Sequence, residues 1–324
     1  MGRSTWKYQV FFLFSLILHS QVPFPSSLSF SLSSMPPCSA LLHFSKSFSL
    51  DQHASDAQTS YPKTASWRED KHCCSWDGVE CDKNTSHVVG LDLSSSWLMG
   101  HIHSNSTLFF LPNLRRLNLA DNWFNLSLIP SEFGNFKSLT HLNLSLSVFA
   151  GQIPFEISQL SSLVSLDLSE NELLIEAPVW KRVIGNLTQL RELILDFTNM
   201  SSIRPNSSMN LSSSLTTLSL RYCDLRGKLE SNILCLPNIQ TFDLSHNSFS
   251  GLLPSSLFNL PNLSTLGLGN NQLVGPLPSH LIVIVGVGGP KFPPSWMGGT
   301  YYYHILKQSL GADSHYLLGR FHVK

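Results

Sequence analysis

The chain has 324 residues, of which 13% are charged, about half of the roughly 25% that is usual in soluble domains. Lysine plus arginine and aspartate plus glutamate both total 21, so the formal net charge is zero. A nucleic-acid-binding protein needs a surplus of basic side chains, so this balance argues against nucleic acid as a partner. Leucine (55), serine (52) and asparagine (20) are abundant, which suggests internal repeats.

The first residues have the pattern of a secretory signal peptide. Arg3 and Lys7 are basic, Val10–Leu18 is an apolar run, and small residues follow up to Ser26 and Ser27. The apolar run is shorter than the roughly 20 residues that a membrane-spanning helix needs. We therefore expect residues 1–26 to be a signal peptide that directs the chain into the secretory pathway.

Four of the six cysteines form a cluster near the start of the chain, at Cys38, Cys73, Cys74 and Cys81. An even number of clustered cysteines in a secreted chain predicts two disulfides. Adjacent Cys73 and Cys74 point in different directions, so they are not expected to pair with each other. The preferred connectivity is Cys38–Cys73 with Cys74–Cys81. A zinc site at His72, Cys73, Cys74 and Cys81 is the weaker alternative, since no CxxC pair is present. We expect neither a metal nor a cofactor.

Sequons for N-glycosylation support secretion independently. They occur at Asn84, Asn105, Asn125, Asn143, Asn186, Asn199, Asn206, Asn210 and Asn262. Several of these are expected to carry glycans and therefore to be exposed.

One leucine-rich frame recurs from Leu91 onward and is clearest between Leu163 and Leu173. The central apolar residue of each copy falls at positions 91, 117, 142, 166, 193, 218, 242 and 266, with intervals of 24 to 27 residues. This period is typical of leucine-rich repeats. The two leucines of L-x-L share one face of a short strand, and each copy buries its apolar side only against its neighbours. We predict an α/β repeat fold: a leucine-rich-repeat solenoid over residues 87–281, with short parallel strands on its concave face.

A polar station follows the strand of most copies. It holds Asn122, Asn171, Asn247 and Asn271, and the same position holds Ser147, Thr198 and Cys223. Asparagine there can bond backbone groups that the turn leaves unpaired in the core. Serine and threonine are expected to make part of this network, and cysteine a weaker version.

The frame LxxLxLxxNxLxGxIP resembles the plant-specific class of extracellular leucine-rich repeats. The segment from Ser39 to Phe48 is similar to the helix of that class's N-terminal cap, and Trp67 followed by CCSWDGVEC at residues 73–81 is similar to its signature. Together these features resemble plant receptor-like proteins of the tomato Cf-type disease-resistance family. The resemblance implies a disulfide-bonded N-terminal cap over residues 38–82. It also implies a cell-surface immune receptor without a kinase, which signals through partner receptor kinases.

The chain departs from the family pattern after the last copy. The frame is lost from His280, and residues 282–324 are expected to be a poorly ordered tail that does not cap the solenoid. No membrane-spanning segment is expected beyond the signal peptide. We interpret the chain as a truncated product, with a genuine short secreted form as the alternative.

The sequence contains no catalytic constellation, such as GxSxG, HExxH or a P-loop, so an enzyme is not expected. The concave face is the candidate binding surface, and the residues that depart from the repeat's usual Asp and Ser are the candidate contacts. They are Arg191, Glu192, Ile194, Asp196, Phe197, Thr217, Arg221 and Tyr222. Neighbouring exposed Phe, Tyr and Arg residues are typical of a protein-binding hot spot.

These observations favour an extracellular receptor-like protein that recognises a protein or peptide ligand in plant defence. The expected location is the extracellular or plasma-membrane surface. A secreted inhibitor of a pathogen cell-wall-degrading enzyme is one alternative, and a non-productive truncated product is the other.

Overall fold

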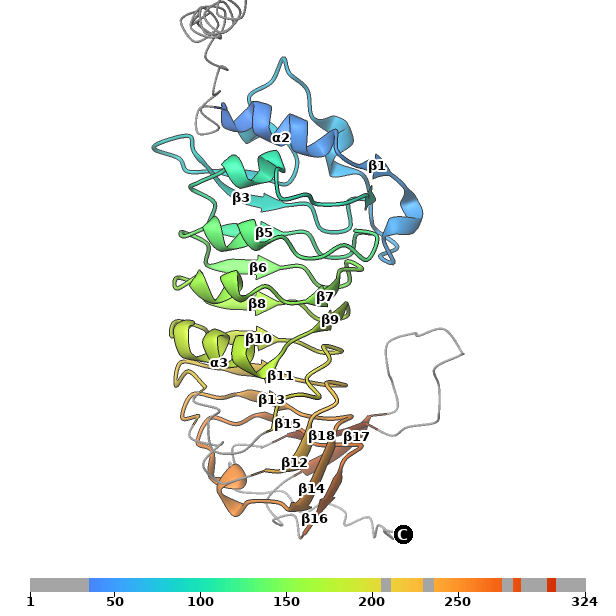
Figure 1. Cartoon of the computed structure of the whole chain (residues 1–324), viewed down its shortest axis with the longest axis vertical. Coiled ribbons are helices and arrows are strands. Elements are labelled where there is room, and N and C mark those ends of the chain that lie inside the picture. Colours follow the sequence, from blue (N-terminus) through green and yellow to red (C-terminus); the bar gives the residue numbers. More distant parts are fainter. Residues whose placement is uncertain (1–34, 205–210, 230–235, 276–281, 287–301, 307–324) are drawn as a thin grey trace, which may run out of the picture. The chain divides into compact units, whose positions relative to one another are not determined.

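Each leucine-rich copy contributes one short strand, and these strands pair side by side in sequence order (Figure 1). The computed structural model describes residues 35–204, 211–229, 236–275, 282–286 and 302–306. The predicted signal peptide therefore lies outside the described residues. The parallel strands are β3 (Val88–Asp92), β5 (Arg116–Asn118), β6 (His141–Asn143), β8 (Ser165–Asp167), β10 (Glu192–Ile194), β11 (Thr217–Ser219), β13 (Thr241–Asp243) and β15 (Thr265–Gly267).

The register of this sheet aligns the central apolar residues of successive repeats. Leu91 pairs with Leu117, and Phe242 pairs with Leu266. All of these central side chains are buried, because each lies on the inner face of its strand between the equivalent residues of its neighbours. The leucine-rich-repeat solenoid predicted from the sequence is thus confirmed.

Buried asparagines hold the turn that follows each strand. Asn171 Nδ2 donates to three backbone carbonyls of its own and the preceding repeat at 2.8–3.0 Å. Its Oδ1 accepts from the backbone N–H groups of Ser147 and Phe149 at 3.2 and 2.9 Å. Asn122 and Asn247 make the same five contacts.

The substituted stations differ in how much of this network they keep. The Ser147 hydroxyl donates to two carbonyls at 2.9 and 2.8 Å, and the Cys223 thiol makes two longer contacts at 3.2 and 3.3 Å. The expectation for Thr198 is wrong, because its buried hydroxyl has no hydrogen-bond partner among the described residues.

The convex side consists of short helices between the strands. They are η5 (Thr107–Phe110), η6 (Ser131–Asn135), η7 (Phe155–Gln159), η9 (Ser255–Asn259) and α3 (Ala177–Asn186). Pro154 and Pro254 immediately precede η7 and η9. The ten-residue α3 falls in the longest interval of the array, between Leu166 and Leu193, where the extra residues lengthen a 3-10 turn into an α-helix.

Two smaller sheets form where the chain leaves the concave face. One pairs β7 (Ala150–Gln152) with β9 (Glu172–Leu174), and the other joins β12 (Arg226–Lys228), β14 (Ser248–Leu252) and β16 (Gln272–Val274). All of these pairs are parallel. They give successive repeats a second set of backbone hydrogen bonds.

The N-terminal cap covers the first repeat. It contains α2 (Pro37–Ser45), β1 (Ser49–Leu50), η2 (Gln52–Ala54), η3 (Lys63–Ser66), η4 (Cys73–Ser75) and β2 (Val79–Cys81). The antiparallel strand β2 closes the edge of β3, and β1 pairs with β4 (Leu98–Met99). Gly78 immediately precedes β2 and has a φ of 77°. A Cβ on this residue would overlap the carbonyl oxygen of Asp92.

The cap's disulfides join Cys38 to Cys73 and Cys74 to Cys81, the pairing that the sequence favours. The stacked rings of Trp67 and Trp76 lie beside them, with centroids 5.1 Å apart. The grouping of His72 with two of these sulfurs does not provide thiolates, because the sulfurs are bonded to each other. The alternative zinc interpretation therefore lacks its ligands.

The far end of the large sheet departs from the expected irregular tail. Two segments of the tail are strands, β17 (Ile282–Gly286) and β18 (Tyr302–Leu306). They pair with each other antiparallel, and β18 pairs antiparallel with β15, the last strand of the repeats. The β-branched residues between Ile282 and Val285 favour extended backbone, and the pairing gives the edge of β15 a partner. The rest of the tail lies outside the described residues.

The polar station offers a test of what holds the repeats together. Replacing Asn247 by alanine leaves buried backbone donors and acceptors unpaired, so we expect a loss of about 3 kcal/mol in the free energy of unfolding. Thr198→Val is the matched control at the same station, where removing an unpartnered hydroxyl should leave stability unchanged or raise it slightly. Urea unfolding followed by circular dichroism measures both. Equal effects of the two substitutions would contradict the assignment.

Candidate functional site

The concave face of the large sheet carries a shallow trough of about 580 Å³. It extends across the strands from β2 in the cap to β10 and is lined by residues on either side of the buried central leucines. Its lining includes Glu80, Arg116, His141, Asn143, Asp167, Glu192 and Ile194. Side chains alternate between the two faces of a strand, so the residues next to each buried central leucine point onto this concave surface.

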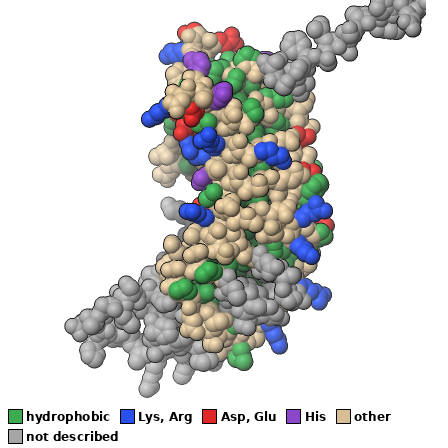
Figure 2. Space-filling view, turned by 90° about the vertical axis from the view of Figure 1, so that its left-hand side faces the viewer, with side chains coloured by type: hydrophobic (Ala, Val, Ile, Leu, Met, Phe, Trp, Pro, Cys, Tyr) green, Lys and Arg blue, Asp and Glu red, His purple; other side chains and the backbone are tan. Residues whose placement is uncertain are grey.

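The charges of the trough are not evenly balanced along its length. Near the cap, Arg116 pairs with Glu80, and Lys63 lies 3.1 Å from a carboxylate oxygen of Asp92. Towards β10, neither Asp167 nor Glu192 has an ion-pair partner among the residues that the structure describes. The end of the trough between β8 and β10 is therefore the more negative one. Figure 2 shows another face, where lysine and arginine side chains are scattered along the molecule.

The usual Asp and Ser of each repeat make a local turn contact. Oδ1 of Asp167 accepts hydrogen bonds from the backbone N–H and the hydroxyl of Ser169 at 3.0 and 2.6 Å. Asp243 and Ser245 do the same at 2.9 and 2.6 Å. Burial raises the pKa of Asp167, although these hydrogen bonds act in the opposite direction. These Asp–Ser pairs therefore have a clear structural role.

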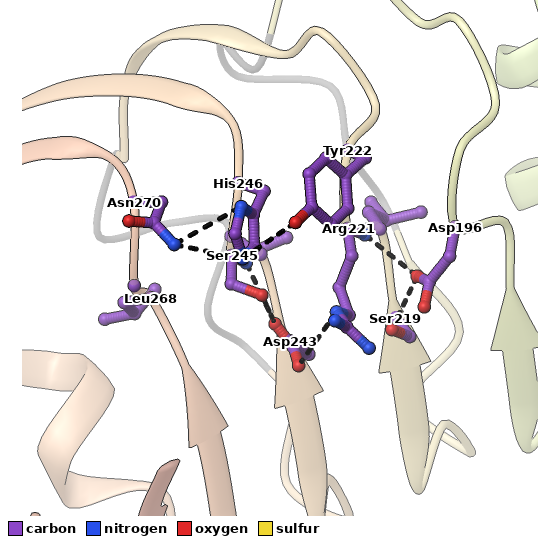
Figure 3. A network of polar contacts seen from close by, with 12 residues as sticks. Asp196, Ser219, Arg221, Tyr222, Asp243, Ser245, His246, Leu268 and Asn270 are labelled. Atoms are coloured by element: carbon purple, nitrogen blue, oxygen red, sulfur yellow. Dashed lines mark hydrogen bonds and ion pairs between the residues drawn. The ribbon is translucent and has the colours of Figure 1, made fainter. Parts of the chain in front are cut away.

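The repeat centred on Leu193 changes this contact. Ile194 occupies the usual Asp position, and the carboxylate is moved two residues on, to Asp196. Its Oδ1 accepts from the Ser219 hydroxyl at 2.6 Å and from the Arg221 backbone N–H at 2.8 Å, both in the next repeat (Figure 3). A contact within one repeat is thus replaced by a contact between two.

The electrostatics of Asp196 reflect its position in this network. Burial raises its pKa, while the hydrogen bonds from Ser219 and Arg221 act in the opposite direction. The guanidinium Nε of Arg221 lies 3.8 Å from Asp243 Oδ2, and the Arg221 side chain is 25% exposed. Arg221 is therefore held between two repeats.

Three rings stack along the same edge of the sheet. The centroids of Phe197 and Tyr222 are 4.5 Å apart, and those of Tyr222 and His246 are 3.9 Å apart, with nearly parallel planes. The Tyr222 hydroxyl lies 3.2 Å from His246 Nε2, and the Asn270 amide lies 3.0 Å from the same nitrogen (Figure 3). Burial and the nearby Arg221 lower the pKa of His246 to about 4, so its ring is neutral near pH 7.

The structure brings the sequence-predicted residues together only in part. Glu192 and Ile194 line the trough, Arg191 is exposed beside Glu192, and Thr217 is half-buried on β11. Phe197, Tyr222 and Arg221, which the sequence suggests are exposed, are half-buried in the stack and the Asp196 network, and their role in binding stays a prediction. Side chains at equivalent positions of adjacent repeats are close enough to pack against each other.

Sequence reasoning missed His246, Asn270 and Asp243 as members of this network. Phe197, Tyr222, His246 and Asn270 each lie four residues after a central apolar residue and have positive φ. Comparing this one position across neighbouring repeats would have found His246 and Asn270, whereas Asp243 lies directly after the central Phe242.

The predicted glycosylation sites lie on different surfaces. Asn84, Asn105, Asn125, Asn186, Asn199 and Asn262 are exposed. Asn143 is half-buried on β6 and lines the trough. Asn206 and Asn210 lie outside the described residues.

The cap and repeats match known family models. The leucine rich repeat N-terminal domain matches residues 38–82, and the Leucine Rich Repeat model matches residues 113–136 and 238–260. Receptor-like protein 6 of Arabidopsis thaliana is 43% identical over 190 residues, which are 56% of this chain and 19% of that protein. Receptor-like protein Cf-9 of Solanum pimpinellifolium is 42% identical over 212 residues, which are 62% of this chain and 24% of that protein.

Solved structures of plant receptors share the fold. The structure of PEPR1–AtPEP1 superposes with a TM-score of 0.59 at 29% identity, covering 73% of this chain and 31% of that one. The plant peptide hormone receptor RGFR1 in complex with RGF2 superposes with a TM-score of 0.51 at 31% identity, covering 63% of this chain and 31% of that one.

The cap, the parallel sheet and the asparagine stations define a plant-type leucine-rich-repeat protein. In sequence the cap and repeats are similar to those of plant receptor-like proteins, Cf-9 among them. It spans about a fifth to a quarter of the length of the two curated relatives described above. Among the described residues, no helix has the length and apolar character needed to cross a bilayer.

The raised pKa of Asp196 makes stability depend on pH in a defined direction. The folded state binds this proton more tightly than the unfolded chain, so protonation stabilises the fold, and this contribution is lost as pH rises through the folded pKa. The window lies between the ordinary Asp pKa of about 3.9 and the raised value. Asp196→Asn keeps an acceptor oxygen but removes the titration. We therefore expect the melting temperature of the wild type to rise relative to that of the variant as pH falls from neutral into this window. Parallel melting curves over pH would contradict this.

Proposed function

We propose that this chain forms the ligand-recognising part of an extracellular plant receptor that binds an extended protein or peptide segment along its concave face. The observation that carries the proposal is the trough across consecutive parallel strands, with Glu192 and Ile194 at its open negative end. An extended peptide can lie across the strands and place successive side chains against successive repeats. The peptide hormone receptor RGFR1, which shares the fold, supports a ligand of this kind.

The setting that fits best is plant defence at the cell surface. The likeness to receptor-like protein Cf-9 supports this role. Two disulfides and six exposed sequons suit an oxidising, extracellular compartment. Signalling through a partner receptor kinase follows from the family resemblance, because the chain offers a binding surface and no catalytic motif.

The charge of the trough narrows the class of ligand. Glu80 and Asp92 are paired with cations near the cap, whereas Asp167 and Glu192 are not paired among the described side chains. A ligand with lysine or arginine would complement this end, while Ile194 offers an apolar contact beside it. Such complementarity acts on specificity and association rate.

A displayed library of random peptides tests this recognition. We expect peptides selected on the secreted wild-type chain to be enriched in lysine and arginine and to bind Glu192→Ala about tenfold more weakly, equivalent to about 1.4 kcal/mol. Glu172→Ala is the matched control, because Glu172 is an exposed glutamate on β9, away from the trough. Biolayer interferometry of selected peptides measures the affinities. Equal losses for the two variants, or no enrichment of peptides, would sink the proposal.

A further inference from the structure

Asn143 differs in position from every other sequon that the structure describes. Asn84, Asn105, Asn125, Asn186 and Asn262 lie in turns or at a helix end, Asn199 lies at an isolated β-bridge with Leu174, and all six are exposed. Asn143 is the last residue of β6, in the middle of the large sheet, and its side chain lines the concave trough. A modification there would act on the binding face itself.

The hydrogen bonds of Asn143 leave its amide nitrogen available. Oδ1 accepts from the backbone N–H and the hydroxyl of Ser145 at 2.9 and 2.8 Å. Nδ2, the atom to which an N-linked sugar is attached, donates no hydrogen bond among the described residues. The buried Asn122 shows the opposite arrangement, because its Nδ2 donates to three carbonyls. A sugar on Asn143 Nδ2 therefore keeps every hydrogen bond that this side chain makes.

The equivalent positions of other repeats show how this sequon arises. Asp167 accepts the same two bonds from Ser169 that Asn143 accepts from Ser145. Asn118, one repeat earlier, is followed by Ala120 and is therefore not a sequon. Asn143 thus combines the turn acceptor of the repeat with an attachment site.

The neighbours of Asn143 define what a glycan would cover. Asn118 and Asp167 pair with it across the sheet on either side, and the exposed His141 lies two residues before it on the same strand. All of them line the trough. A branched sugar attached at the floor of a trough of about 580 Å³ occupies the space above these side chains.

Burial of the sequon fixes when it can be modified. Leu144 is fully buried and Ser145 is 8% exposed, so both are packed into the folded repeat. A transferase must read Asn-Leu-Ser on an extended chain, which is available only before this repeat folds. The sugar would then be carried into the folded trough.

We propose that Asn143 carries an N-linked glycan that fills the trough around β6 and restricts ligand access to the end beyond β8. The glycan shields His141 and its neighbours and leaves Glu192 and Ile194 open. The restriction of the ligand rests on the function proposed above, whereas the occupancy and shielding do not.

Glycopeptide mass spectrometry tests the occupancy. The full chain is secreted from cultured animal cells and digested, and the glycans are released enzymatically in heavy-oxygen water, which marks each formerly glycosylated Asn as Asp. We expect the mark at Asn143 as well as at the exposed Asn105 and Asn125, which serve as internal controls. Marked controls with an unmarked Asn143 would overturn the proposal.

Cysteine labelling tests the shielding without any ligand. His141→Cys places a thiol beside Asn143, and Ser131→Cys places one on the exposed start of η6. Each is made in the wild-type chain and with Asn143→Asp, which restores the Asp-Leu-Ser of other repeats and keeps the turn acceptor. We expect a bulky maleimide to react several-fold faster at residue 141 in the Asn143→Asp background and equally fast at residue 131 in both.

The remaining outcomes separate this proposal from the peptide-binding function. Equal labelling at residue 141 in both backgrounds, with Asn143 glycosylated, would overturn the shielding. The glycan can also be removed enzymatically from the folded His141→Cys protein that keeps Asn143. Its labelling rate before and after removal gives the same comparison without the Asn143→Asp substitution. A failed peptide selection alongside a glycosylated, shielded Asn143 would count only against the proposed ligand.

Discussion

The buried amide of the repeat's asparagine is the interaction on which the rest of the fold depends. The strands of most repeats are only three residues long, so the sheet satisfies few backbone groups before the chain turns into the core. Asn122, Asn171 and Asn247 each bond five of the groups that the turns leave buried. Because some of these partners lie in the preceding repeat, the amide joins repeats as well as closing a turn. A leucine core alone would leave those groups unpaired, at considerable cost.

The same turn determines which side chains lie at the edge of the concave face. It places one residue of each repeat at positive φ, including Glu170, Phe197, Tyr222 and His246. Since every repeat turns in the same way, these side chains form a row whose spacing suits the stacking of aromatic rings. Aromatic residues in consecutive repeats therefore pack on one another, as Phe197, Tyr222 and His246 do. The row adds ring contacts between consecutive repeats at the edge of the sheet.

Much of this architecture can be predicted from the sequence because its cause is periodic. The central leucines recur at nearly constant intervals, and the structure pairs Leu142 with Leu166 and Leu193 with Leu218, as the frame requires. The favoured pairing of Cys38 with Cys73 and of Cys74 with Cys81 is likewise present. The leucine pairings follow from repetition of one unit, and the Cys74–Cys81 bridge closes a short local loop.

The features that escaped prediction depend on contacts between repeats. Phe197 and Tyr222 look exposed when each strand is considered alone, yet they stack when two repeats adjoin. Thr198 suits a polar station by residue type, yet its hydroxyl finds no partner among the described residues. The pairing of β18 with β15 joins a tail segment to the last repeat, and no repeat pattern in the sequence predicts this pairing.

Because few residues of the chain are charged, a single polar substitution on the concave face changes the charge and the polar groups of that face noticeably. At the position after the central leucine, the turn needs only an acceptor oxygen, which Asp167 and Asn143 supply equally well. Exchange between Asp and Asn therefore leaves the turn intact while it alters what the face presents. Asp167 adds a negative charge that has no ion-pair partner within the described part of the chain, and Asn143 adds an amide that can carry a sugar. The repeat fold thus separates the atoms that hold the turn from those that determine the surface, so the surface can change from one repeat to the next without a change in fold.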